Sequence, residues 1–341
     1  MPLITSQKNN MIANSPNILL SITIPTWNRS KTLEKSLSIL LPQVLEFKDI
    51  IEIIISDNHS SDDTAKVINS SIEKYQSINF ITYFQKENTG FFGNFKKCKE
   101  LANGQFVWIL SDDDFIQDGV IQEIIQILKI DQADLGILYL DNNERQEKGK
   151  FIKNRSIKIN SLFKQYHYNL TLASSVIFYN KKDNDNVIYN VFKGSNLIGY
   201  ALLVDVIRYK KSGTVLTGYL MQCRMASISG YNIFDAFVFD LSKILKYMLE
   251  IGYEKDVVSH INNAVLKHIL VKRYFFLKAK GKMDSGLQTY PLKKVEKILK
   301  EQFGELPAYK FKIIPIKYTP QILIKISFPI IEKLRNLIRS K

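Results

Sequence analysis

Short apolar runs alternate with amphipathic segments along the N-terminal part of the chain. Four runs are almost wholly apolar, at 18–25, 50–56, 78–84 and 105–110. Between them, apolar residues recur at helical spacing and predict helices over 30–41, 61–75 and 92–102, with Ser61 as the expected N-cap of the second. Buried strands that alternate with helices are typical of a parallel sheet covered on both faces. The pattern therefore predicts an α/β fold with a doubly wound, mainly parallel sheet.

The pattern changes in the second half of the chain. Two further apolar runs, at 134–140 and 174–179, predict strands separated by a charged, irregular stretch. From Ile233 onward the spacing is helical, at 233–251, around 260–280 and at Leu292–Phe303, and Pro329 interrupts a last basic segment at 322–341. We expect a flexible N-terminus at 1–17, an α/β domain at 18–230 with halves at 18–130 and 131–230, and a helical, basic region at 231–341.

Positive charge is concentrated in the predicted helical region. The net charge is +14, and the part from Leu241 onward holds 21 Lys and Arg against 8 Asp and Glu. This asymmetry indicates an anionic partner, for which nucleic acid, anionic lipid and a pyrophosphate-bearing substrate are the candidates. Cys98 and Cys223 form neither a disulfide framework nor a metal-binding spacing, which fits a reducing cytoplasm. We expect no secretory signal and no membrane-spanning helix, since no apolar stretch has the required length.

Three consecutive carboxylates, Asp112 to Asp114, follow the apolar run at 105–110. In doubly wound sheets the ligand lies beyond the carboxyl ends of the strands, which is where these side chains fall. Their mutual repulsion is relieved by a divalent cation, and oxygen ligands suit Mg²⁺ or Mn²⁺. The alternative is an acidic turn before the next helix. Asp57, directly after the second run, is placed either to accept hydrogen bonds from a base or ribose or to serve only as a turn residue.

Three ordered blocks of sequence carry a resemblance to a known family. They are SITIPTWNRSKTLEKSL, IIEIIISDNHSSDDT and NTGFFGNFKKCKELANGQFVWILSDDD. Together they resemble the family 2 glycosyltransferases with the GT-A fold, over about residues 18–130. The last block is most similar to the abequosyltransferase-like branch, which assembles bacterial surface polysaccharides such as O-antigen or capsule. The resemblance assigns 18–130 to binding a nucleotide-sugar donor and 131–230 to the acceptor.

The resemblance also implies roles for particular residues. Those expected to line the donor site are Pro25, Thr26, Asn28, Arg29, Asp57, Asn88, Gly90, Asn94, Ser111 and Asp112. Those expected to hold Mn²⁺ or Mg²⁺ are Asp112, Asp113 and Asp114, with the main contact on Asp113. Ser111 stands where the family usually has the first aspartate of its metal motif.

The family's catalytic base has no counterpart at its usual position. Family members usually carry an acidic pair before an arginine and a glycine, and ALLVDVIRYKKSG matches in Arg208 and Gly213. The acidic pair then falls on Ala201 and Leu202, so the base is unassigned. Asp205 and Asp141 are the candidates, although an acid such as Asp205 on a helix face is more often merely solvated.

These observations predict a metal-dependent transfer of a sugar from a nucleotide-diphosphate-sugar to a lipid-diphosphate-linked oligosaccharide, and the resemblance implies that the transfer inverts the anomeric carbon. The empty acidic-pair position leaves open a non-catalytic, transferase-like binding subunit. A nucleotidyltransferase is the other alternative, disfavoured because the loop TWNRS has no glycine with which to grip a triphosphate. No G-x-G-x-x-G follows the first strand, which argues against a dinucleotide dehydrogenase. The four histidines, His59, His167, His260 and His268, are not expected to form a metal-ligand cluster.

The basic C-terminal segment predicts a cytoplasmic protein bound peripherally to the inner face of the bacterial plasma membrane. The apolar residues expected near one helical face are Ile322, Ile326, Ile330, Leu334 and Leu337, and those expected to meet anionic headgroups are Lys333, Arg335 and Arg339. The alternative is a helix packed on the domain with its charges in water. We expect no nucleic-acid partner, because KRYFFLKAK reads better as a helix that buries its aromatic residues than as a stacking surface for bases.

Overall fold

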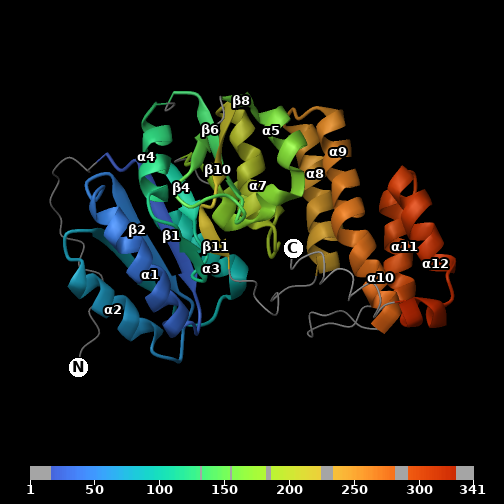
Figure 1. The fold of residues 1–341 in the computed structure, drawn as a ribbon, viewed down its shortest axis with the longest axis horizontal. Coiled ribbons are helices and arrows are strands. Elements are labelled where there is room, and N and C mark those ends of the chain that lie inside the picture. The colour runs from blue at the N-terminus through green and yellow to red at the C-terminus, as the bar shows by residue number, and fades with distance from the viewer. Residues whose placement is uncertain are drawn as a thin grey trace.

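The computed structural model describes residues 17–130, 133–153, 156–181, 186–223, 233–280 and 291–327. A central sheet has the strand order β3-β2-β1-β4-β9-β6-β10-β7, with β8 paired to β10, and helices lie on both of its faces (Figure 1). The strands of this sheet are β1 (Leu20–Thr26), β2 (Ile51–Asp57), β3 (Asn79–Phe84), β4 (Phe106–Ile109), β6 (Leu135–Asn142), β7 (Phe151–Lys153), β8 (Ile157–Lys158), β9 (Val176–Tyr179) and β10 (Ser212–Gly218). The predicted mainly parallel sheet is confirmed.

The first four strands run parallel to one another, so their carboxyl ends lie at one edge of the sheet. Leu20 pairs with Ile51 at one end of β1 and β2, and Thr26 pairs with Asp57 at the other. Strand β4 lies on the other side of β1, also in parallel. Both β1 and β2 are buried along almost their whole length, which explains their continuous apolar sequence. The loops after β1, β2 and β4 therefore meet at one edge.

Strand β9 reverses the direction of the sheet in its middle. It pairs antiparallel with β4 on one side and with β6 on the other, so β6 runs parallel to β4. Strand β10 continues parallel to β6, whereas β7 and β8 pair antiparallel with β10. A separate two-stranded sheet pairs β5 (Asp114–Ile116) with β11 (Met221–Cys223), which joins the segment after the acidic residues to the segment after β10.

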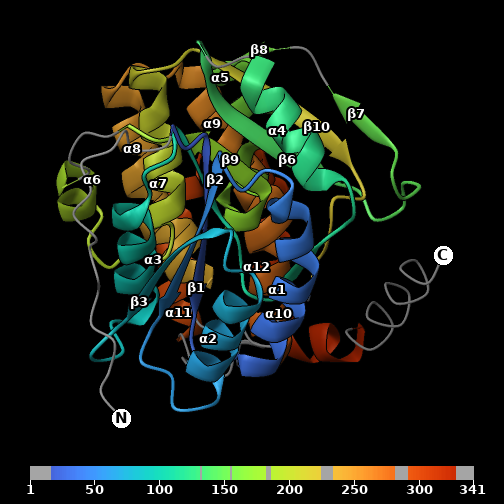
Figure 2. The ribbon, with the colours of Figure 1, turned by 90° about the vertical axis from the view of Figure 1, so that its left-hand side faces the viewer.

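Helices cover the two faces of the sheet (Figure 2). One face packs on α1 (Ser30–Leu45), α2 (Thr64–Lys74) and α4 (Val120–Ile130). The other face packs on α3 (Gly90–Leu101), α5 (Ile159–Tyr166) and α7 (Ile198–Asp205), and α6 (Asn186–Val191) packs in the same core. The predicted N-cap of α2 was wrong. Helix α2 begins at Thr64, and the carboxylate of Asp62 accepts hydrogen bonds from its backbone N–H at 3.1 Å and from that of Ser30, the first residue of α1, at 3.0 Å. Asp62, and not Ser61, thus accepts hydrogen bonds from the first backbone N–H groups of both helices.

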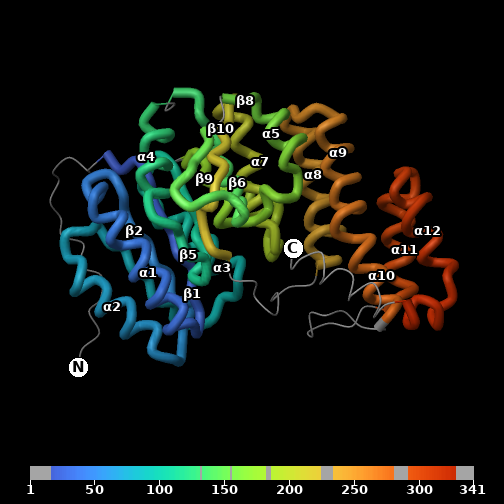
Figure 3. Tube along the Cα trace, viewed as in Figure 1, coloured from blue at the N-terminus to red at the C-terminus, as the bar shows by residue number. Residues whose placement is uncertain are grey.

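The described residues from Ile233 onward form mainly helices, as predicted, and extend away from strands β1 to β4 (Figure 3). Its helices are α8 (Leu241–Glu250), α9 (Lys255–Val265), α10 (Val271–Lys280), α11 (Leu292–Phe303) and α12 (Ile314–Tyr318), with π-helical turns at Asp235–Asp240, Leu266–Leu270 and Tyr309–Ile313. One continuous hydrophobic core runs from β4 through α7 to α11, and it includes Val107, Tyr200 and Leu299. Within the described ranges no helix is both long and apolar enough to cross a bilayer.

Candidate active site

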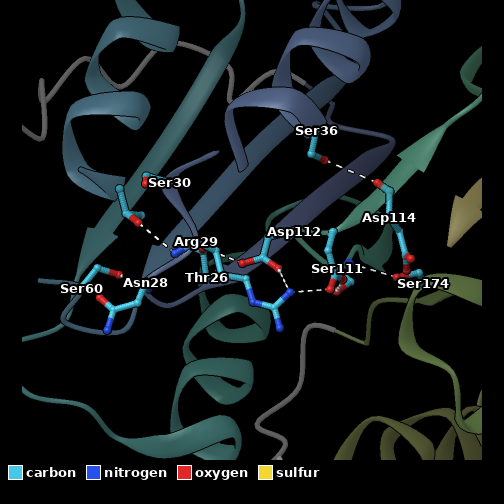
Figure 4. Close-up of polar contacts among 12 residues, drawn as sticks. Thr26, Asn28, Arg29, Ser30, Ser36, Ser60, Ser111, Asp112, Asp114 and Ser174 are labelled. Carbon is cyan, nitrogen blue, oxygen red and sulfur yellow. Dashed lines mark hydrogen bonds and ion pairs between the residues drawn. The ribbon is translucent and has the colours of Figure 1, made fainter. Parts of the chain in front are cut away.

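Two aspartates after β4 converge on one arginine after β1 (Figure 4). The guanidinium of Arg29 lies 3.6 Å from Asp112 and forms an ion pair and hydrogen bond with Asp113. The hydroxyl of Thr26 donates to Asp112 Oδ2 at 2.7 Å, and that of Ser111 donates to Asp113 Oδ1 at 2.6 Å. The structure therefore brings together five of the residues predicted for the donor and metal site: Thr26, Arg29, Ser111, Asp112 and Asp113.

The two carboxylates are buried, and this has an electrostatic cost. Asp112 is 5% exposed and Asp113 is 7% exposed. Burial raises the pKa of Asp112 from 3.8 to about 6, and repulsion from Asp113 and Asp114 adds to this, whereas the hydrogen bond from Thr26 and the charge of Arg29 oppose it. The negative charge at the end of β4 is thus only partly balanced, and Arg29, whose side chain is 41% exposed, is its nearby counter-charge.

The donor set at the end of β4 fits a hard divalent cation that shares its ligands with a substrate. Asp112 and Asp113 present carboxylate oxygens around a position where a cationic group already lies. Asp114 begins β5 and pairs in register with Cys223 instead of contacting Arg29. No group of three Asp, Glu, His or Cys side chains in the described part of the chain is arranged to hold a metal by itself. Mg²⁺ typically takes one or two carboxylates and completes its shell with substrate phosphates and water.

Asp57 lies at the end of β2, one strand from this centre. It is 3% exposed and accepts hydrogen bonds from the backbone N–H of Ser60 at 3.2 Å and from its hydroxyl at 2.5 Å. Asn28, whose φ of 51° is in the left-handed region, accepts from the backbone N–H of Ser61 at 2.7 Å and donates its own N–H to the Ser60 hydroxyl at 2.8 Å. The loops after β1 and β2 are therefore hydrogen-bonded to each other without a ligand.

A buried asparagine that the sequence analysis missed organises the third loop. Asn58 is 4% exposed, donates to the side-chain oxygen of Asn88 at 2.8 Å and accepts from the backbone N–H of Thr89 at 2.9 Å. The Asn88 oxygen also accepts from the N–H of Gly90 at 2.8 Å, where a φ of 71° favours glycine. Its position directly after Asp57, at the end of a strand, is the one feature of the sequence that could have indicated a role for Asn58 at this edge.

Asn94, predicted to line the donor site, is 4% exposed and lies beneath that site. Its amide donates to the carbonyls of Ser56 at 3.1 Å and Thr26 at 3.4 Å, and its side-chain oxygen accepts from the Ser56 hydroxyl at 2.6 Å. These contacts join the ends of β1 and β2. Its geometry is that of a residue that positions the two loops. Ser174, also missed, accepts from the backbone N–H of Ser111 at 2.9 Å.

The two candidate bases lie at opposite edges of the sheet. Asp141 is the penultimate residue of β6, which runs parallel to β4, so it is at the same edge as Asp112. It is partly exposed, and the Thr217 hydroxyl lies 3.3 Å from its Oδ2. Asp205 contacts Lys181, which lies just after β9. Because the end of β9 pairs with the start of β4, Asp205 lies at the opposite edge of the sheet.

The interpretation of Asp205 as a solvated helix residue was wrong. It is 1% exposed and lies in a network with Lys181 at 2.6 Å, Arg208 at 3.4 Å and the hydroxyl of Tyr247, which donates to it at 2.5 Å. These partners come from the segment after β9, the turn after α7, and α8. A buried carboxylate with this many partners holds the acceptor half and the C-terminal helices together.

Three of the histidines are brought together by the fold. The ring centroid of His167 lies 6.2 Å from that of His260 and 6.5 Å from that of His268, with the rings stacked. Burial lowers the pKa of His167, and the neighbouring His260 and His268 add to this effect. His59 lies apart from them in the loop after β2, with a φ of 65°. The sequence did not indicate this proximity, because His167 lies in the turn after α5, His260 in α9 and His268 in the π-helical turn after α9.

Comparisons with known proteins agree with this geometry. Residues 21–188 match the family described as glycosyl transferase family 2. The GalNAc(5)-diNAcBac-PP-undecaprenol beta-1,3-glucosyltransferase of Campylobacter jejuni is 38% identical over 109 residues, which cover 31% of this chain and 33% of the relative. Abequosyltransferase RfbV of Salmonella typhimurium is 36% identical over 120 residues, 35% of this chain and 34% of the relative. The chain is thus matched over about a third of the length of these relatives.

A solved structure extends the likeness over most of the chain. Residues 1–349 of S. aureus TarS, in complex with UDP-GlcNAc, superpose with a TM-score of 0.58 at 17% sequence identity, covering 92% of each chain. At this identity the likeness shows a shared fold. Residues 21–188 therefore match glycosyl transferase family 2, and the described residues have the GT-A fold that the resemblance implies.

Proposed function

We propose that the protein transfers a sugar from a nucleotide-diphosphate-sugar to a hydroxyl of a lipid-diphosphate-linked oligosaccharide, with inversion at the anomeric carbon. The observation that carries the proposal is the pair of buried carboxylates, Asp112 and Asp113, placed around one cationic group one strand away from Asp57. The relative from Campylobacter jejuni, named for an undecaprenol-linked acceptor, and the relative named as an abequosyltransferase support the acceptor class and a role in surface-polysaccharide assembly.

The donor would lie along the edge formed by the loops after β1, β2 and β4. Asp57 accepts hydrogen bonds from the base or ribose, and Arg29 provides positive charge for the diphosphate. Asp112 and Asp113 would hold Mn²⁺ or Mg²⁺, and the ion would supply positive charge to the diphosphate leaving group. Thr26 and Ser111 keep the two carboxylates oriented through their hydroxyl groups.

Asp141 is the proposed base for the acceptor hydroxyl. It shares the carboxyl edge of the sheet with Asp112 and Asp113 and is partly exposed, so it can meet an acceptor that approaches across β9. A general base must be within hydrogen-bond reach of the proton that it removes, which Asp205 cannot be from the opposite edge. Asp141 then receives the proton as the hydroxyl oxygen attacks the anomeric carbon from the face opposite the diphosphate.

A panel of UDP-, GDP-, CDP- and dTDP-sugars, each with and without Mn²⁺, tests the donor part of the proposal. A ligand that binds only the folded state at a hundredfold excess over its Kd stabilises the protein by about 2.7 kcal/mol, which a thermal-shift assay detects. We expect one nucleotide class to raise the Tm, and to do so more strongly with Mn²⁺. A panel in which no nucleotide-sugar raises the Tm under either condition would contradict the proposal.

Changing Asp57 to Ala is expected to weaken binding of the free nucleoside diphosphate as well as of the nucleotide-sugar. The lost bond is a charge-assisted one to the base or ribose, which corresponds to about 1.5–3 kcal/mol. Calorimetric titration of both ligands measures the change. The matched control is Ser60→Ala, which removes the hydroxyl that donates to Asp57 and leaves the carboxylate in place. Unchanged nucleotide affinity in Asp57→Ala would identify Asp57 as a turn residue only.

A further inference from the structure

The end of the molecule formed by the C-terminal helices carries exposed apolar side chains on described residues. Phe311 is 80% exposed and Tyr318 is 76% exposed. With Pro315, which is also exposed, they are spaced by four and three residues, the spacing of neighbours on one helix face. The helical residues 321–327 add exposed Ile322, Leu323 and Ile326, at 63%, 54% and 62%. We call these six residues the aromatic face.

The aromatic face is the outer side of helices whose inner side is packed. Tyr309 and Ile313 belong to the main core, and Ile324, 2% exposed, packs on Ala279 of α10. The exposed side chains therefore lie on helices that are packed against the rest of the protein. Large apolar side chains gathered on a fixed surface usually mark a site of contact with a protein or a membrane.

Polar contacts with α10 hold this surface in place. The ammonium group of Lys278 donates to the carbonyl of Ile316 at 2.6 Å and to that of Lys317, at the end of α12. The side-chain amide of Gln321 donates to the carbonyl of Lys278 at 3.0 Å, and Lys317 pairs with Glu296 at 3.7 Å. A surface that is held by buried contacts can be presented to a partner at little further cost in conformational entropy.

The charge around the aromatic face selects the kind of partner. Residues 291–327 contain eight lysines and three glutamates. Lys310, Lys312 and Lys325 are exposed beside the apolar positions. A second copy of the chain would bring the same positive charge and be repelled, whereas a bilayer with anionic headgroups attracts lysines and accepts apolar and aromatic side chains at its interface.

We propose that the aromatic face docks on an anionic lipid bilayer, with Phe311, Tyr318 and Ile322 entering the interfacial region and the flanking lysines meeting headgroup phosphates. This inference rests on the proposed function only in that a lipid-linked acceptor lies at such a surface. It differs from the sequence-based expectation, which relied mainly on 330–339. Of that segment's predicted face only Ile322 and Ile326 are among the described residues, and both are exposed, whereas Ile330, Leu334, Leu337, Lys333, Arg335 and Arg339 lie outside them.

Co-sedimentation of the full chain with vesicles tests the docking surface. We expect binding to phosphatidylcholine vesicles that contain phosphatidylglycerol, little binding to phosphatidylcholine alone, and weaker binding as salt is raised. The double variant Phe311→Ser, Tyr318→Ser is expected to lose at least about tenfold in affinity for the anionic vesicles, since two large apolar side chains no longer enter the interface. Both positions are exposed, so its Tm should match that of the wild type.

The matched control is Ile152→Ser, which removes a 54% exposed apolar side chain from β7 and should leave vesicle binding unchanged. Wild-type binding by the double variant, or equal binding to both vesicle types, would overturn the proposal. The alternative occupant is a second copy of the chain, and light scattering at several protein concentrations detects it. A dimer that the double variant abolishes would mean that a second copy covers this face. Vesicle binding requires neither donor nor metal, so its failure and a failure of sugar transfer are separate results.

Discussion

Asp113→Asn is expected to abolish metal-dependent donor binding and to leave the fold intact. Asp113 contacts Arg29 and accepts from Ser111, and its position at a strand end means that its carboxylate serves the ligand more than the core. Loss of even a residue that only orients a metal ligand typically costs 10–100-fold in metal affinity, so loss of a ligand should cost at least about 100-fold. Titration with nucleotide-sugar, with Mn²⁺ present or replaced by EDTA, measures the effect, and thermal unfolding in EDTA checks the fold.

Two further variants show whether the effect belongs to Asp113 itself. Asp118→Asn removes an exposed carboxylate from the next loop and should retain the full Mn²⁺ dependence. Asp114→Asn tests the third of the predicted metal ligands, and we expect a smaller loss because Asp114 belongs to β5 and does not contact Arg29. A wild-type Mn²⁺ dependence in Asp113→Asn would show that the metal position is wrong.

Asp141→Asn is expected to lower kcat by about 10²–10⁴-fold, the usual contribution of a general base. Donor affinity should not change, because Asp141 lies on β6, two strands from β4, and an asparagine oxygen can still accept from Thr217. Transfer of a radiolabelled sugar to a lipid-diphosphate-linked acceptor, measured at saturating donor, gives kcat. Calorimetric titration of the nucleotide-sugar on the same preparation gives the donor affinity.

Asp205→Asn separates the two candidate bases. It leaves Lys181, whose side chain is 14% exposed, beside an uncharged partner, so we expect a lower free energy of unfolding and an unchanged mechanism. At a temperature where both variants are folded, Asp205→Asn should keep most of its kcat and Asp141→Asn should not. The reverse result would place the base at Asp205, and a wild-type kcat in Asp141→Asn would show that the base is another residue.

The donor half could be predicted from the sequence because its signals are local. Each of its strands is a nearly continuous apolar run, and the polar residues that follow, such as Thr26, Asp57 and Asp112, must lie at one edge once the strands are parallel. The convergence of the loops after these strands could be anticipated for the same reason. The resemblance to a known family then gave these residues chemical roles that the spacing alone does not assign.

The acceptor half was less predictable because its structure depends on distant partners. The apolar run of β9 carries no sign of its direction, which its antiparallel pairing with β4 and β6 decides. The burial of Asp205 depends on Lys181 and Tyr247, which are 24 and 42 residues away in sequence. Asn94 looked like a ligand contact because a motif shows which residue is present and not whether it faces the ligand or the backbone beneath it.

The core shared by the acceptor half and the C-terminal helices limits how this protein can be changed by recombination. Tyr253, before α9, packs against Phe163 of α5 with ring centroids 5.2 Å apart, and its hydroxyl donates to the carbonyl of Val204 in α7 at 3.0 Å. A crossover near residue 230 that exchanged the helices for those of a relative would break such contacts and expose apolar surface on both sides. The two parts should therefore be inherited together. The donor half is no freer to be exchanged, since the core beneath α1 and α4 also contains Leu138 of β6 and Leu216 of β10.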